Sequence, residues 1–302
     1  MSLAKRLAII IPSYGRTKAL CQTLNKMLVL KPCPDEIWVM EQSKNIEADV
    51  VKACEELPCK IHLRHLSRPG AQAARNQAAR ESSADILLFL DDDVDPEPRL
   101  VEAHLENYRD PTIHAVAGFY LEPGESETSQ PKDDIWWRPL TQLERYPASY
   151  SKRVDSPLWP SCNGSIRREV FLKLGGFDEN YRYTLLDDTD LAVRMQKAGF
   201  RCVHDSKARL FHRKEPSGGN RPTKPGDRVI ASREKWYTWT YFFLVNYGAL
   251  GVPELIWRIR RNIFRKAYFK NLYLLKISCL EALIGVIGGL QKALSGRKTI
   301  KL

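Results

Sequence analysis

Asp85-Ile-Leu-Leu-Phe-Leu-Asp-Asp-Asp-Val-Asp95 is the part of this 302-residue chain that says most about its architecture. The five apolar residues Ile86–Leu90 are typical of a strand that is buried on both faces of a sheet. Four carboxylates follow, at positions 91, 92, 93 and 95, and carboxylates this close repel one another unless a cation lies among them. Oxygen ligands suit Mg²⁺ or Mn²⁺. The stretch predicts a divalent-cation site at a sheet edge, and a solvated acidic loop is the alternative.

Strand-like and helix-like segments alternate over the first 120 residues. The expected strands are Leu7–Ile11, Glu36–Met40, Lys60–His65, Ile86–Leu90 and Ile113–Phe119. The expected helices are Thr17–Leu28, Ile46–Glu56, Ala71–Ser82 and Pro98–Arg109. This rhythm predicts an α/β fold whose mostly parallel, Rossmann-like sheet carries helices on both faces and binds ligands at the carboxyl ends of its strands. Segments 12–14, 41–43 and 91–93 each follow a strand and are expected at that edge.

The positive charge of the chain is concentrated near its C-terminal end. The net charge is +11, and residues 228–302 contain 14 Lys or Arg residues but only three acidic ones. This asymmetry predicts a neutral domain over residues 1–227 and a basic helical extension over 228–302. Seven scattered cysteines without a Cys-x-x-Cys motif argue against a disulfide framework or a zinc site. Because no apolar run reaches the roughly 20 residues of a membrane span, we expect a cytosolic protein.

Six motifs occur in a recognisable order. They are Ile9-Ile-Ile-Pro-Ser-Tyr-Gly-Arg16, Arg68-Pro-Gly-Ala-Gln-Ala-Ala-Arg-Asn76, Leu88-Phe-Leu-Asp-Asp-Asp93, Gly164-Ser-Ile-Arg-Arg168, Gly175-Gly-Phe-Asp178 and Leu186-Asp-Asp-Thr-Asp-Leu191. In this order and spacing, the region from about Leu7 to His212 resembles family 2 glycosyltransferases of the GT-A fold. The resemblance implies inverting, metal-dependent transfer of a sugar from a nucleoside-diphosphate sugar to a hydroxyl of a glycan or lipid-linked acceptor in cell-surface polysaccharide synthesis.

The resemblance also implies a donor site. The residues expected to bind the donor nucleotide are Pro12, Ser13, Tyr14, Arg16, Glu41, Gly70, Arg75, Asn76, Asp91 and Asp92. Tyr14 is expected beside the base, and Glu41 is expected to accept a hydrogen bond from a ring N–H of the base. Gly70 permits close approach of the backbone, and a helix that begins at Ala71 offers free N–H groups to a diphosphate.

The remaining site residues follow from the same resemblance. Asp93, Asp91 and His212 are expected to hold Mn²⁺ or Mg²⁺. Asp188 is the expected catalytic base, because the attacking hydroxyl must lose its proton; simple capping of a helix is the alternative. The residues expected on the acceptor and sugar side are Asn163, Gly164, Asp187 and Trp159.

The basic extension suggests a membrane partner. Residues Leu255–Leu275 are expected to form one amphipathic basic helix, with Trp236, Tyr237, Trp239 and Trp257 as interfacial aromatics. Such a helix is typical of contact with an anionic membrane, here its inner face, and a homodimer is a further possibility. The alternative is a helical subdomain packed on the rest of the chain. Two rival functions are a nucleotidyltransferase and a nucleic-acid-binding protein, although no nucleic-acid module is recognisable and we expect no nucleic-acid partner.

Overall fold

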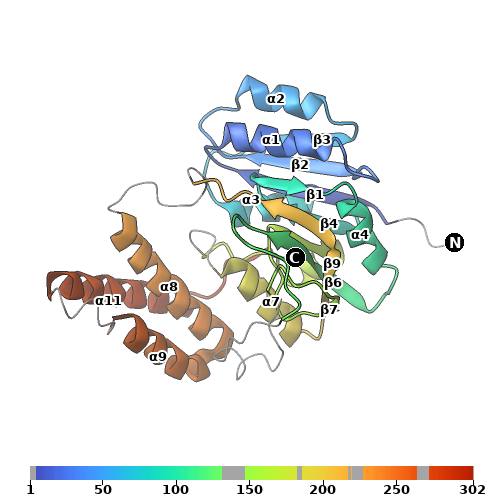
Figure 1. The fold of residues 1–302 in the computed structure, drawn as a ribbon. Helices are drawn as coiled ribbons and strands as arrows, with labels where there is room; N and C mark the ends of the chain where they lie inside the picture. The colour runs from blue at the N-terminus through green and yellow to red at the C-terminus, as the bar shows by residue number, and fades with distance from the viewer. Residues whose placement is uncertain are drawn as a thin grey trace.

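The computed structural model describes residues 5–130, 147–181, 186–216, 219, 227–263 and 272–301 (Figure 1). Nine strands form one sheet in the order β3-β2-β1-β4-β8-β6-β9-β5, and β7 pairs with β9. The strands are β1 (Leu7–Ser13), β2 (Glu36–Glu41), β3 (Lys60–His65), β4 (Ile86–Leu90), β5 (Val94–Pro96), β6 (Ile113–Leu121), β7 (Val154–Asp155), β8 (Asn163–Arg167) and β9 (Arg201–His212). All five expected strands are present, and the apolar strand β4 is fully buried as predicted.

The sheet is parallel where the α/β alternation predicted it and mixed beyond that region. Strands β1, β2, β3 and β4 pair in parallel. Strand β8 then runs antiparallel between β4 and β6, and β5 runs antiparallel to β9. Because β6 and β9 point the same way as β4, the carboxyl ends of six strands still share one edge. The acidic run at positions 91–93 lies at this edge, directly after β4.

Helices cover both faces of the sheet, as expected. Side chains on β1 alternate between two apolar cores, because successive residues of a strand point to opposite faces. One core contains Leu7, Ile9 and Ile11 and is covered by α1 (Thr17–Met27), α2 (Ala48–Glu55) and α4 (Leu100–Asn107). The other contains Ala8 and Ile10 and is covered by α3 (Ala71–Glu81), α6 (Arg168–Lys173) and α7 (Asp187–Lys197).

Among the described residues of the C-terminal part, three helices lie to one side of the sheet; they are drawn in orange and red in Figure 1. These helices are α8 (Asp227–Tyr247), α9 (Val252–Ile263) and α11 (Leu272–Leu294), and the short 3₁₀ helix η1 (Gly248–Gly251) joins α8 to α9. Helix α8 packs along α11 and touches α7. No described helix is long and apolar enough to cross a membrane. The division of the chain at residue 227 stays a prediction.

The extension differs from the expected single amphipathic helix. Helix α9 ends at Ile263 and α11 begins at Leu272, and residues 264–271 between them lie outside the described part of the chain. Trp236 and Tyr237 are buried, and Trp239 is half-buried against Trp236 at a ring distance of 5.3 Å. These aromatics hold the helices together rather than facing an interface. Among the expected interfacial residues with described side chains, only Trp257 is exposed.

Aromatic packing under β4 anchors the second core. The ring of Phe89 is fully buried and lies 5.5 Å from Trp159, 5.2 Å from Phe171 and 5.4 Å from Phe177. Edge-to-face and tilted contacts of this kind add to the stabilisation from burial alone. Strand β4 therefore brings its carboxylates to the sheet edge from a rigid base.

We expect Phe89→Ala to lower the free energy of unfolding by about 3–5 kcal/mol, because it leaves a cavity among three large rings. Urea denaturation followed by circular dichroism measures the loss. The matched control is Leu28→Ala, since Leu28 is 45% exposed, and its expected loss is below about 0.5 kcal/mol. Equal losses for the two variants would contradict the assignment of Phe89 to the core.

Candidate active site

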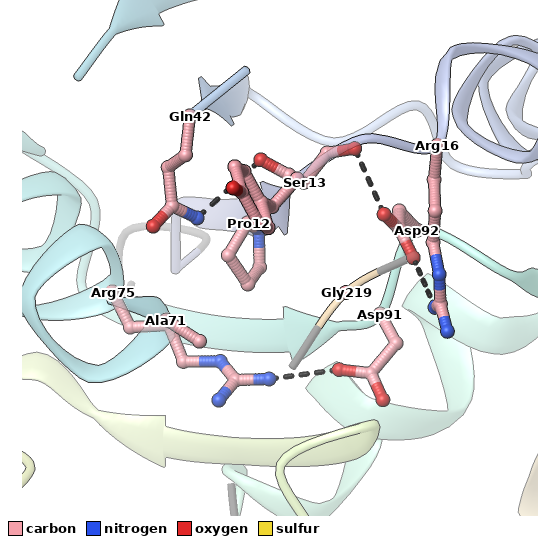
Figure 2. Close-up of a pocket in the computed structure, with 10 residues that line it drawn as sticks. Pro12, Ser13, Arg16, Gln42, Ala71, Arg75, Asp91, Asp92 and Gly219 are labelled. Atoms are coloured by element: carbon pink, nitrogen blue, oxygen red, sulfur yellow. Dashed lines mark hydrogen bonds and ion pairs between the residues drawn. The ribbon is translucent and has the colours of Figure 1, made fainter. Parts of the chain in front are cut away.

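A pocket opens at the carboxyl ends of β1, β2 and β4 (Figure 2). The residues that line it are Pro12, Ser13, Tyr14, Arg16, Gln42, Ala71, Arg75, Asp91, Asp92 and Gly219. It thus gathers residues from all three polar segments that follow strands, together with the first turn of α3. The side chain of Tyr14 is 39% exposed at its rim. A pocket of this kind, beside a helix N-terminus, suits a phosphorylated ligand.

Asp92 holds the floor of the pocket together. One carboxylate oxygen accepts a hydrogen bond from Ser13 Oγ at 2.8 Å, and the other accepts one from Arg16 Nη1 at 2.9 Å. Burial raises the pKa of Asp92 to about 6, although Arg16 and Ser13 act in the opposite direction. Figure 2 shows Asp92 between these two partners. Its contacts therefore fix the turn after β1 to the acidic run after β4.

Asp91, Asp93 and His212 form a group that fits a divalent cation. One ligand atom from each lies within 4.8 Å of the others, and Asp93 and His212 are buried. His212 Nε2 is 3.1 Å from Asp93 Oδ1 and 3.8 Å from Asp91 Oδ2. Two carboxylates and one imidazole form a donor set that Mn²⁺ accepts. Strand pairing produces this proximity, because β5 is antiparallel to β9 and sets Val94 opposite His212.

The ionisation of this group also fits a cation. Burial acts to raise the pKa of Asp93, but the hydrogen bond and charge of His212, with Arg16, lower it to about 2. Burial acts to lower the pKa of His212, but Asp93, Asp91 and Glu122 raise it above its usual value. The carboxylates thus attract positive charge to this point, and a metal ion there would replace the imidazole proton.

Arg75 joins the donor pocket to a second acidic pair. Its guanidinium donates to Asp91 Oδ1 at 2.7 Å and lies 3.7 Å from Asp187 Oδ2, at the start of α7. Gln72 Nε2 also donates to Asp187, at 3.1 Å. Arg75 is 2% exposed and lies over the ring of Phe177. This arrangement brings Asp187 and the adjacent Asp188 next to the pocket, although more than 90 residues separate them from Asp91 in sequence.

Asp188 has the protonation behaviour of a base that works near neutral pH. Burial first, and the adjacent charge of Asp187 second, raise the pKa of Asp188 to about 7. The backbone N–H of Thr189 donates to its carboxylate at 2.6 Å, so the group is held at the start of α7. A carboxylate with this pKa accepts a proton more readily than an ordinary aspartate does.

Three of the residues predicted to bind the donor nucleotide, Glu41, Gly70 and Asn76, do not line the pocket. Glu41 is buried and accepts hydrogen bonds from the backbone N–H groups of Gln42 and Ser43, so that Gln42 lies in the pocket wall instead. Asn76 is turned away, because it donates to the carbonyl of Phe177 and accepts from its N–H. These two residues support the walls of the site.

Three of the four residues expected on the acceptor and sugar side, Asn163, Gly164 and Trp159, also lie in the core. Asn163 donates to the carbonyls of Phe119 and Ala208, and its oxygen faces His104 Nε2 at 3.0 Å. Gly164 and Trp159 are packed together, with the indole N–H bonded to the carbonyl of Ser165 at 2.8 Å. Gly70, which was expected on the donor side, is the N-cap residue of α3. Its N–H donates a hydrogen bond to Gln42 Oε1 at 2.6 Å.

Sequence reasoning missed several residues at the site. Glu122 lies 3.7 Å from His212 Nδ1 and pairs with Lys214. Burial and the charges of Asp91 and Asp188 raise the pKa of the buried Cys162 thiol, and the charge of Arg75 acts in the opposite direction. Glu122 could have been found from its position, because it follows β6 at the same edge of the sheet as the other polar segments. Gln42 was not predicted as a site residue, because its acidic neighbour Glu41 was the residue of this segment that was expected to contact the base.

The fold is that of the GT-A class. The sequence profile of the family described as "Glycosyl transferase family 2" matches residues 8–175, more than half of the chain. The chain therefore belongs to glycosyl transferase family 2. It is 24% identical over 223 residues to validoxylamine A glucosyltransferase of Streptomyces hygroscopicus subsp. limoneus, a match that covers 64% of this chain and 48% of that protein. The chain spans about half or less of the length of several curated relatives that it matches.

Solved structures share the fold. The mannosyltransferase PcManGT from Pyrobaculum calidifontis, solved with GDP-Man and Mn²⁺, is 17% identical with a TM-score of 0.54, and the match covers 97% of this chain and 88% of that one. GalNAc-T7, solved with UDP, GalNAc and Mn²⁺, is 15% identical with a TM-score of 0.58, over 87% of this chain and 55% of that one. These likenesses confirm the expected GT-A fold.

Proposed function

We propose that this protein transfers a sugar from a nucleoside-diphosphate sugar to a hydroxyl group of a glycan or lipid-linked acceptor, with inversion at the anomeric carbon. The observation that carries the proposal is the line of groups from the pocket to α7. The Asp91–Asp93–His212 group lies at one end, Arg75 lies in the middle, and Asp188 lies beside Asp187 at the other end. A leaving diphosphate and an attacking hydroxyl thus have separate binding groups on one side of the sheet.

The donor end is built for a nucleoside diphosphate. Asp91, Asp93 and His212 would hold Mn²⁺ or Mg²⁺, and such an ion neutralises the charge of the departing diphosphate. The N-terminal turn of α3, which begins at Ala71 beside the pocket, adds backbone N–H groups. Tyr14 and Gln42 form the wall next to the end of β2, where we place the base. A nucleotidyltransferase is less well supported, because Arg16 is engaged with Asp92 and Asp93 rather than turned toward a triphosphate.

Transfer to a hydroxyl group needs a base at the acceptor end, and we propose Asp188 for this role. Asp188 would remove the proton of the attacking hydroxyl as the new glycosidic bond forms. The described residues around it include no second carboxylate that is placed for a covalent intermediate, since Asp187 is paired with Arg75 and Gln72. Direct displacement therefore fits this site better than a two-step reaction does.

The donor site predicts metal-dependent nucleotide binding. Calorimetry with UDP, GDP, CDP and dTDP, each with and without Mn²⁺, is expected to show one preferred diphosphate that binds more tightly with the metal. His212→Ala is expected to weaken the Mn²⁺-dependent binding by about 10–100-fold, the range for a lost ligand or its supporting partner. His114→Ala is the matched control, because His114 lies at the amino end of β6, at the opposite edge of the sheet from the pocket. Failure to bind any of the four diphosphates would overturn the proposed function.

The base predicts a characteristic variant and pH profile. We expect Asp188→Asn to lower kcat by about 10²–10⁴-fold while the diphosphate still binds. Because burial and Asp187 raise the pKa of Asp188 to about 7, wild-type kcat should fall as the pH drops below 7, where the base becomes protonated. The measurement is the initial rate of diphosphate release from the preferred donor between pH 5 and pH 9. Near-normal turnover by Asp188→Asn would rule out its role as the base.

We also propose that the extension contacts an anionic membrane, through a face that the helix packing leaves open. The exposed apolar side chains of α11 recur mostly three or four positions apart and are Leu280, Leu283, Ile284, Ile287, Leu290 and Leu294. Ile256 and Trp257 of α9 are also exposed. Lys276 and Arg260 are exposed on the same two helices, whereas Glu281 and Glu254 are paired with Arg233 and Arg258. Apolar side chains beside unneutralised cations suit an anionic lipid surface, where lipid-linked acceptors reside.

Vesicle binding tests the membrane proposal. The protein is expected to sediment with phosphatidylcholine vesicles that contain 30% phosphatidylglycerol at low salt, about tenfold more than with vesicles of phosphatidylcholine alone. Leu283→Glu with Ile287→Glu should abolish sedimentation, whereas Leu28→Glu, at an exposed apolar position of the sheet domain, should leave it unchanged. If the wild type stays in solution and the double variant turns a dimer into a monomer by light scattering, the face belongs to a second copy instead.

A further inference from the structure

The segment Arg297–Ile300, here called the clasp, follows α11 and returns to the sheet domain. The N–H of Glu179 donates to the carbonyl of Lys298 at 2.8 Å, and the N–H of Ile300 donates to the carbonyl of Gly175 at 2.7 Å. Ile300 is buried in the second core. The clasp thus adds a short run of backbone pairing along the Gly-Gly-Phe-Asp motif, a motif to which the proposed reaction assigns no role.

Two glycines make room for the clasp. A Cβ at Gly175 would lie 3.0 Å from the side chain of Thr299, and a Cβ at Gly176 would lie 2.8 Å from Ile300 Cδ1. Both glycines also have positive φ angles, +79° and +66°, which other residues adopt only with strain. The motif is therefore shaped to receive this segment.

Arg297 connects the clasp to the helix that carries the base. Its Nη1 donates to Asp190 Oδ1 at 2.6 Å and lies 3.4 Å from Asp178 Oδ2, and its Nη2 donates to Asn246 at 2.9 Å. The side chains of Asp178 and Asp190 are fully buried, so a charge on either would be strongly destabilising without a cation beside it. The pKa of Asp190 is lowered: burial opposes this, but Arg194 and Arg297 outweigh it.

Asp190 lies in the first turn of α7, one helical position beyond the pair Asp188-Thr189. Its N–H closes that turn onto the carbonyl of Leu186 at 2.8 Å. Its carboxylate accepts from Tyr181, Asn246 and Arg194 as well as from Arg297. Leu186, just before the helix, has a φ of +65°, so the turn must be held from outside. The anchors of Asp190 therefore decide where Asp188 points.

We propose that Arg297 is a positioning residue for the reaction, which it serves by holding Asp190 and hence the first turn of α7 with Asp188. This inference rests on the proposed role of Asp188 as the base. It makes the helical extension a structural part of the active site, because the clasp and Asn246 of α8 both reach Asp190 from it. Arg297 has no contact with the donor pocket among the described residues.

Kinetics and nucleotide binding of Arg297→Ala test the proposal. We expect kcat to fall by about 10–100-fold, since small displacements of a reacting group have effects of this size. The affinity for the preferred diphosphate with Mn²⁺, and its binding stoichiometry, should stay within twofold of the wild type. Lys298→Ala is the matched control, because Lys298 belongs to the same clasp and its exposed side chain pairs with Glu179 but does not reach α7. The kcat of this variant should be unchanged.

A double-mutant cycle separates positioning from general loss of structure. If Arg297 acts through Asp190, Arg297→Ala with Asp190→Asn should lower kcat no further than the worse single variant. Multiplicative losses, or a fall in diphosphate affinity parallel to kcat, would overturn the proposal. If Arg297→Ala does not fold, Arg297→Lys takes its place, because it keeps the charge but lacks the two-pronged contact with Asp190 and Asn246.

Hydrogen exchange tests the proposal without any turnover. The amides of residues 190–193 should exchange at least tenfold faster in Arg297→Ala than in the wild type, and those of β1 should not change. Unchanged exchange in α7 would overturn the role of the clasp even if the enzyme were active. Conversely, a wild-type protein that binds no diphosphate, yet shows faster exchange in the variant, would overturn the proposed function and leave the clasp intact.

Discussion

The burial of several carboxylates at the end of one strand is the constraint on which the rest of the site depends. Strand β4 ends in a fully apolar core, and of the three carboxylates that follow it Asp92 and Asp93 are buried, whereas Asp91 is 30% exposed. Each is paired with a basic side chain: Asp91 with Arg75, Asp92 with Arg16, and Asp93 with both Arg16 and His212. Because buried charge without a partner is costly, the first turn after β1, helix α3 and the end of β9 are all drawn to this point. The electrostatic balance of one short segment thus arranges three distant parts of the chain.

The same pairing of buried charges connects the two ends of the site, which we propose to be its donor and acceptor ends. Arg75 is buried, and it satisfies Asp91 on one side and Asp187 on the other. Burial has the larger effect in raising the pKa of Asp188, and the charge of Asp187 raises it further. In the proposed reaction, the arrival or departure of a diphosphate and its metal would change the charge beside Asp91 and would act on Asp188, the proposed base, through one guanidinium.

The sequence was a good guide wherever a local pattern determines the structure, and a poor one wherever side chains from distant segments meet. The strands Lys60–His65 and Ile86–Leu90 were predicted to the residue, because the first alternates polar and apolar residues and the second is a continuous apolar run. The acidic run predicted a cation site by itself, but His212 was expected there only from the family resemblance, since nothing local links position 212 to position 93. Asn163 and Trp159 look like exposed ligand-binding residues in sequence but satisfy buried carbonyls, an outcome that depends on the antiparallel insertion of β8.

The glycines of α11 explain why the extension presents an apolar face outward. An added Cβ at Gly285 would meet the carbonyl of Arg233, and one at Gly289 would lie 2.6 Å from the carbonyl of Tyr237. Helix α11 therefore packs backbone to backbone on α8 along its glycine side, which leaves little contact area for its larger residues. The leucines and isoleucines, a few positions away on the same helix, remain exposed. In the sequence, this segment is only short and rich in glycine. In the fold, its glycine side packs on α8, and the helix is followed by the clasp that anchors α7. Its other side, with the exposed leucines and isoleucines, remains available for a lipid surface.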